Sequence, residues 1–139
     1  MKFRLSAAAV AATLFATTVA AQAAATLTLN LDCGSDQGRV MIAVFSSEAA
    51  YNGQGAPVRA IAATPGQPVQ IEGLAPGRYA VKSFHDLNGN GKMDSNPFGM
   101  PTEPFAFSNN ARGNRGPAPW SAAAFDVAAS GAVQTLVLK

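Results

Sequence analysis

Short apolar or alternating segments, separated by Gly, Pro and Asn, run through most of the chain and constrain its fold more than any other feature. Residues 26–32 alternate, with Leu27, Leu29 and Leu31 on one face. Residues 39–46 are apolar on both faces, as in a central strand. No segment keeps a helical period over several turns. The pattern therefore predicts an all-β protein.

Turn residues bound the other expected strands. These strands cover residues 58–63, 69–72, 78–86, 105–108, 123–127 and 134–138. One helical turn is expected at residues 47–51, capped by Ser46 or Ser47, and the last two strands are expected to form a hairpin around Ser130-Gly131. About seven short strands in about 110 residues predict an antiparallel Greek-key β-sandwich of the transthyretin/Ig-like type.

The N-terminus has the parts of a cleaved secretory leader. Lys2 and Arg4 supply positive charge, residues 5–20 form an almost uncharged apolar run, and Ala21-Gln22-Ala23 is an A-x-A cleavage pattern. A membrane anchor is the alternative, but the run is short for a span and is diluted by Ser and Thr. We therefore expect a signal peptide at residues 1–23, cleavage near Ala23, a periplasmic single domain at residues 24–139, and no membrane span in that domain.

Removal of the leader changes the charge balance. The chain has ten Lys and Arg and eight Asp and Glu, and the loss of Lys2 and Arg4 leaves eight of each. A neutral domain gives no electrostatic argument for binding nucleic acid or an anionic membrane. The single cysteine, Cys33, excludes an internal disulfide and is expected to be an apolar residue near a strand end.

A nine-residue segment, GLAPGRYAV, begins at Gly73. Pro76 and Gly77 suit the two corners of a type II turn, with a positive φ at Gly77, and the Tyr79 hydroxyl is placed to bond backbone. The segment resembles the strand-turn-strand element of transthyretin-like and carboxypeptidase regulatory-like sandwiches. This resemblance implies a fold and carries no chemistry.

A wider resemblance covers residues 73–125, where GLAPGRYAVKSFHDLNGNGKMD is followed by FGMPTEPFAFSNNARG and GPAPWSAAAF. Together with the pattern at residues 38–45, these motifs resemble the bacterial domain of unknown function 2141. The resemblance spans nearly all of the predicted domain. It implies a small exported sandwich and no established activity.

The motif HDLNGNGKMD has the spacing of a loop that binds a hard cation. Asp86, Asn88 and Asn90 fall at the first, third and fifth ligand positions of such a loop, Lys92 offers its backbone carbonyl at the seventh, and Asp94 falls at the ninth. Gly91 takes the sixth position, where a sharp turn is needed. The pattern predicts a calcium-loop-like insert in the sandwich.

The same loop departs from a strong calcium site. Pro97 stands where a bidentate Glu is needed, and Glu103 reaches the loop only if the intervening segment folds over. With few carboxylates and a nearby Lys92, binding of Ca²⁺ is expected to be weak, with Kd on the order of 10⁻⁴ to 10⁻³ M. The alternative is a loop closed by its own Asx-turns, without an ion.

The motifs leave three functional hypotheses open. The leading one is a non-catalytic binding or interaction module whose long segment, residues 96–120, presents Arg112, Arg115 and Trp120 to an unknown ligand or envelope protein. In the alternative reading, Arg112 forms a structural ion pair and Trp120 caps the core.

The other two hypotheses are a metal-dependent hydrolase and a purely structural envelope protein. The hydrolase would use His85, the only histidine, with Asp86, Asp94 or Glu103. No catalytic residue is assigned, because His85 and Asp86 are expected to point to opposite faces of their strand.

Overall fold

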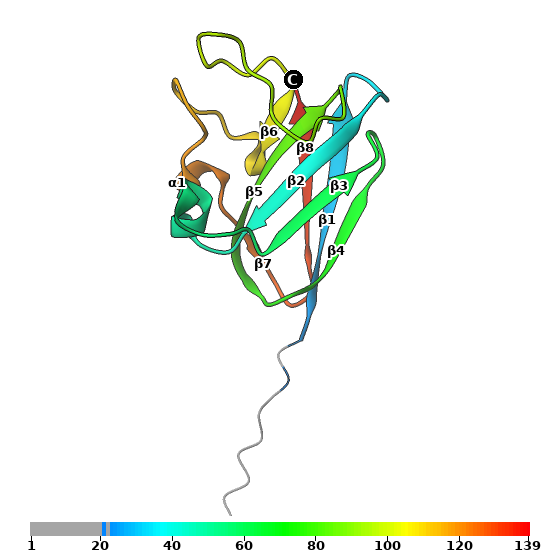
Figure 1. The fold of residues 1–139 in the computed structure, drawn as a ribbon. Helices are drawn as coiled ribbons and strands as arrows, with labels where there is room; N and C mark the ends of the chain where they lie inside the picture. Colours follow the sequence, from blue (N-terminus) through cyan, green and yellow to red (C-terminus); the bar gives the residue numbers. More distant parts are fainter. Residues whose placement is uncertain (1–20, 22) are drawn as a thin grey trace, which may run out of the picture.

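The structure, a computed structural model, describes residue 21 and residues 23–139. The predicted signal peptide therefore lies almost entirely outside the described residues. In the part described, eight strands form two sheets that pack face to face (Figure 1). The strands are β1 (Ala25–Cys33), β2 (Arg39–Phe45), β3 (Arg59–Ala63), β4 (Val69–Leu74), β5 (Gly77–Asp86), β6 (Phe105–Phe107), β7 (Phe125–Val127) and β8 (Ala132–Leu138).

The smaller sheet has the order β4-β1-β8, and the larger sheet has the order β3-β2-β5-β6, with β7 paired to one end of β5. The all-β sandwich predicted from the sequence is confirmed. Every strand pairing is antiparallel except that of β1 with β8, which is parallel. Within residues 23–139, helix is limited to short turns, at Ala50–Gln54, Ser108–Asn110 and α1 (Trp120–Ala123).

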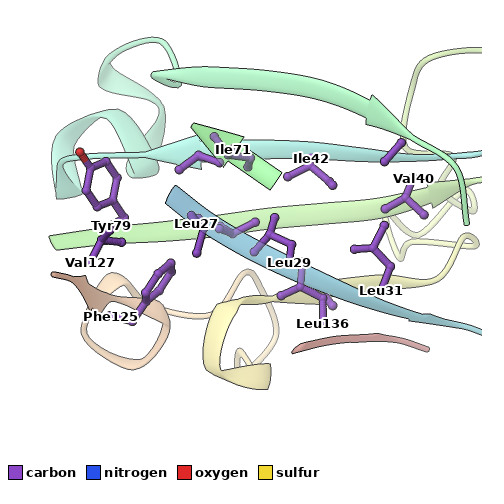
Figure 2. Close-up of a cluster of buried hydrophobic side chains, with 14 of the residues drawn as sticks. Leu27, Leu29, Leu31, Val40, Ile42, Ile71, Tyr79, Phe125, Val127 and Leu136 are labelled. Atoms are coloured by element: carbon purple, nitrogen blue, oxygen red, sulfur yellow. The ribbon is translucent and has the colours of Figure 1, made fainter. Parts of the chain in front are cut away.

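The core lies between the two sheets. Leu27 and Leu29 have no exposed surface and Leu31 is also buried, which confirms the alternation predicted for β1. Figure 2 shows these leucines between Val40 and Ile42 of β2 on one side and Leu136 of β8 on the other. Burying one leucine side chain stabilises a fold by about 1.5–3 kcal/mol, so this strand contributes strongly to the free energy of folding.

The turn after β4 does not have the backbone conformation expected from the sequence. Gly77 does not have a positive φ; the left-handed residue is Gly73, with a φ of 74° inside β4. The register of β1 with β4 shifts at this end, between Ala25 and Leu27, which is the local irregularity that a glycine in a strand permits. The Tyr79 hydroxyl donates to the Ala75 carbonyl at 2.7 Å, as expected, so it holds the turn closed.

The hairpin expected around Ser130-Gly131 is wrong. β7 pairs with β5 in one layer and β8 pairs with β1 in the other, so the connection between them crosses from layer to layer. One bridge, Ala128 to Gly131, remains of a local pairing. The short helix α1, which the sequence pattern did not predict, precedes β7.

We predict that Leu29→Ala lowers the free energy of unfolding by about 2–5 kcal/mol, because the side chain is fully buried and the sheets cannot close the cavity. Val133→Ala on β8 is the matched control: its side chain is 66 % exposed, and the expected change is within about 0.5 kcal/mol. Urea unfolding of the two variants measures both values. Equal destabilisation would contradict the assignment of the core.

Candidate functional site

An open groove of about 1100 Å³ lies on the outer face of the larger sheet. Its floor comes from side chains of β2, β3 and β5 that point away from the core. The strand register explains why they meet: Met41 lies opposite Ala62 and Phe84, and Ala43 lies opposite Ala60 and Lys82. The three alanines are small, so the floor is low between larger neighbours. The central strands β2 and β5 are thus largely apolar on their outward face as well as on their inward face.

The first wall of the groove is β6 and the loop that precedes it. Phe105 and Phe107 pack edge to face at 5.8 Å. Residues 95–101 form a small hairpin whose tip carries Phe98, which is 89 % exposed, and Met100, which is 63 % exposed. Asn96 stabilises this tip, because its side-chain oxygen accepts from the backbone N–H groups of both residues at 3.0 Å. The hairpin thereby holds two large apolar side chains at the rim.

The second wall is the segment 113–117, which contributes Gly113, Arg115, Gly116 and Pro117. This segment turns very tightly. A Cβ on Gly113 would lie 1.8 Å from the carbonyl oxygen of Gly116, so only glycine fits there. Arg115 has a positive φ of 59° in this turn. Its side chain lines the groove and is one of the two cationic side chains there.

Lys82 is the other cation of the groove and rises from its floor. Its Nζ donates to the Tyr51 carbonyl at 2.5 Å and lies 4.2 Å from the centre of the Tyr51 ring and 5.4 Å from that of Phe45. Partial burial lowers the pKa of Lys82 below its ordinary value. Burial also raises the pKa of Tyr51 to about 12, so at neutral pH the phenol is uncharged and is no counter-ion for the ammonium.

The groove has no acidic residue. Its lining is mainly methionine, phenylalanine, alanine, proline and glycine, with Lys82 and Arg115 as the only charged members. Among residues 23–139, the one ion pair joins Arg78 to Asp126 at 4.0 Å on the surface. Lys82 therefore has no carboxylate partner in the described part of the chain. The electrostatic character of the groove is positive on an apolar background.

A second, smaller recess of about 330 Å³ adjoins the groove at Lys82 and Pro117. The turn at Ala50–Gln54 forms one side of it. This turn has no side-chain cap at its N-cap residue, Ala49, although the Ser47 hydroxyl accepts from the Ala50 N–H at 3.3 Å. The Tyr51 hydroxyl donates to the Ala118 carbonyl at 2.7 Å, which ties this turn to the second wall. Lys82 thus stands where the groove and the recess meet.

The predicted cation loop lies at the end of β5 and begins with a buried carboxylate. Asp86 is only 2 % exposed, and its two oxygens accept from the backbone N–H groups of Gly89, Asn90 and Gly91 at 2.8–3.1 Å. Three such bonds fold the chain around one side chain. The loop curls as the spacing of its residues predicted, with Gly89 and Gly91 in the left-handed region.

The remaining oxygen-bearing side chains of the loop converge. The amide groups of Asn88 and Asn90 donate to the two oxygens of Asp94 at 2.5 and 2.9 Å. Glu103 reaches back, as the sequence left open, and accepts from the N–H groups of Leu87 and Asp94 at 3.0 and 3.1 Å. Lys92 joins the cluster through its backbone N–H, which donates to the Asn90 side-chain oxygen at 2.8 Å. Its ammonium forms no ion pair with a carboxylate of residues 23–139.

His85 is fully buried and faces the core side of β5. Its Nε2 lies 2.5 Å from the Gln37 carbonyl, and its Nδ1 has no hydrogen-bond partner. Within residues 23–139 no three His, Cys, Asp or Glu side chains gather closely enough to hold a metal ion. The geometry therefore brings His85 neither to a cleft nor into a metal cluster with Asp94 and Glu103.

The predicted ligand surface is only partly brought together. Arg115 lines the groove, whereas Arg112 does not. Arg112 also forms no ion pair with a carboxylate of the described chain. Trp120 is half-buried and packs edge to face on Tyr51 at 5.7 Å, which is the core-capping role considered as its alternative.

Lys82 and the methionines of the groove were not among the site residues predicted from the sequence. Met41, Met93 and Met100 all line the groove, and Met1 is the only other methionine of the chain. A signal was present, since residues 39–46 are apolar on both faces and one of those faces had to be covered. The groove itself could not be seen in a local pattern, because the pairing that places Met41 beside Phe84 joins residues far apart in the sequence.

Fold and groove together define a small β-sandwich with an apolar surface cavity and two cationic side chains. The profile of a family described as "Uncharacterized protein conserved in bacteria (DUF2141)" matches residues 32–135. The chain belongs to this family, which confirms the resemblance seen in its motifs. None of the curated proteins and none of the solved structures matches the chain significantly. In the part that the structure describes, no helix has the length and apolar character to span a membrane.

We predict that Asp86→Asn lowers the free energy of unfolding by about 2–3 kcal/mol, because a neutral amide cannot replace a carboxylate that accepts three backbone N–H groups. Asp32→Asn is the matched control: Asp32 is exposed on β1, and the expected change is within about 0.5 kcal/mol. Chemical denaturation of both variants tests the prediction. If the two variants unfold alike, Asp86 does not organise the loop.

Proposed function

We propose that the protein is an exported, non-catalytic binding module that holds a largely apolar small ligand in the groove on the outer face of the larger sheet. The observation that carries the proposal is the lining of this groove. Ligand sites in proteins are concave and mostly apolar, with a few polar groups that orient the ligand, and their volumes are about 300–1000 Å³. The groove of about 1100 Å³ lies just above the upper end of that range.

Its side chains also suit an adaptable site. Methionine is flexible and polarisable, and it is used on surfaces that accommodate ligands of varied shape. Exposed Phe98 and Met100 are costly in water unless something covers them, since each large apolar side chain gains about 1.5–3 kcal/mol on burial. A ligand in the groove would cover both.

Export to the periplasm is part of the same proposal. It rests on the charged start at Lys2 and Arg4, the apolar run after them, and the cleavage pattern at Ala21-Gln22-Ala23. An envelope protein remains an alternative partner, and a structural envelope protein without a ligand is the alternative function. A hydrolase using His85 has no support from geometry, because a fully buried imidazole cannot reach a substrate.

Blocking the groove tests the proposal. Ala60→Trp places an indole on the floor, and we expect it to weaken the binding of decanol at least about tenfold, because the ligand and the new side chain compete for one volume. The binding is measured by isothermal titration calorimetry on the domain without its leader. Val133→Trp, on the exposed face of the other sheet, is the control and should bind as the wild type does. Unchanged binding in Ala60→Trp would contradict the groove as the site.

We also propose that the loop at the end of β5 binds Ca²⁺ weakly, through Asp86, Asn88, Asn90 and Asp94 and the Lys92 carbonyl. The supporting observation is the convergence of both Asn side chains on the Asp94 carboxylate. The loop has only two carboxylates, and a bound cation would replace these hydrogen bonds with metal–oxygen contacts. The net gain in free energy is therefore small, and the affinity is weak. Such an ion would stiffen the loop beside the groove.

Millimolar Ca²⁺ is expected to raise the melting temperature of the domain by about 3 °C relative to a chelator, because ligand at three times Kd stabilises the fold by about 0.8 kcal/mol. Asp94→Asn should abolish the rise, while Asp32→Asn should keep it. Differential scanning calorimetry is the measurement. Identical melting curves with Ca²⁺ and with chelator would refute the calcium site and leave the groove proposal untouched.

A further inference from the structure

The chemical class of the ligand can be read from the position of Lys82. An ammonium has three donors, and only one of them is used, in the bond to the Tyr51 carbonyl. The two rings beside Nζ shield it from water on their side, which leaves the open side facing the groove and the adjoining recess. An unpaired, partly desolvated cation at this point attracts an anionic group.

The rest of the groove excludes most anions. A phosphate or a sugar acid needs many polar partners, whereas the lining offers methionine, phenylalanine and alanine around the ammonium. No carboxylate of the lining opposes a negative charge, and Arg115 adds a second positive charge to the lining. The complementary molecule has one anionic end and an apolar body.

Resting on the proposed function of the groove, we infer that its ligand is an amphipathic anion, in its simplest form an aliphatic carboxylate. The carboxylate accepts from the Lys82 ammonium where the groove meets the recess. The hydrocarbon chain lies over Met41 and Phe84 and reaches the rim, where it covers Phe98 and Met100. In this arrangement the ligand's carboxylate keeps a hydrogen-bonded partner, and its hydrocarbon chain is removed from water.

A second copy of the chain is the competing occupant of an apolar face. In a symmetric dimer, the same surface of both copies forms the contact. The groove carries two cations and no acidic residue, so the cations of one copy would find no acidic partner in the groove of the other. Charge complementarity therefore favours the small anion.

A series of decyl compounds that differ only in their head group tests the inference on the unmodified domain. Decanoate, decanol and decylammonium present the same chain with a negative, neutral and positive end. Calorimetry below their micellar concentrations should give affinities in that order, with decanoate about tenfold tighter than decanol. Trp120, the only tryptophan, packs on Tyr51, so its fluorescence should respond to decanoate.

Variants at Lys82 identify the partner of the carboxylate. Lys82→Met keeps the length and the apolar stem, and it should weaken decanoate about tenfold while decanol changes by less than about twofold. Lys82→Arg should retain the preference for decanoate. Lys139→Met removes a lysine that does not line the groove, and both affinities should stay unchanged.

The outcomes separate the two proposals. If none of the three compounds binds, the groove is not a ligand site and the proposed function fails. If all three bind with equal affinity, or if Lys82→Met weakens decanoate and decanol alike, the groove binds apolar molecules and the inference of an anion fails. A dimer that persists at saturating decanoate, seen by native mass spectrometry, would show that a second copy fills the face and would also overturn the inference.

Discussion

The larger sheet is apolar on both faces, and the rest of the architecture follows from the need to cover both. One face meets the leucines of β1 and is closed by the smaller sheet. The other face has no third layer in the described chain; it is flanked only by the segments before and after β6, residues 87–104 and 108–119, which lie on the β6 side of the sheet (Figure 1). Cover of this kind is incomplete, and the groove lies where residues of these two segments meet the outward side chains of β2, β3 and β5. The candidate site is thus a consequence of how the sandwich is layered.

Buried carboxylates hold this partial cover in place where packing does not. Asp86 and Glu103 together accept five backbone N–H groups from the loop between β5 and β6. A carboxylate satisfied by several N–H groups is stable in a buried position. The hairpin with Phe98 therefore projects from a base that five hydrogen bonds hold together. Directly after β6, the Ser108 hydroxyl accepts from the Val81 N–H and donates to the Ala123 carbonyl, which anchors the start of the second segment.

Local patterns were sufficient for part of this structure. Alternation predicted β1, and the Asn-Gly run predicted the curled loop, because each depends on neighbouring residues. The positive φ expected at Gly77 lies instead at Gly73, because the irregular pairing of β4 with β1 at that end depends on residues of both strands. Lys82 was missed because its meaning comes from Tyr51 and from the register of β5 with β2, which no local window contains. Arg115 was anticipated as part of a surface, but its partners across the groove were not.

The three methionines of the groove give this surface a sensitivity to oxidants. Conversion of a thioether to a sulfoxide replaces an apolar, flexible side chain with a polar one. Met100 is 63 % exposed and would react first, at the rim, whereas Met41 on the floor and Met93 are half-buried. Sulfoxides there would make the cavity more hydrophilic without disturbing the leucine core between the sheets. Oxidative damage would therefore impair what the surface holds before it impairs the fold.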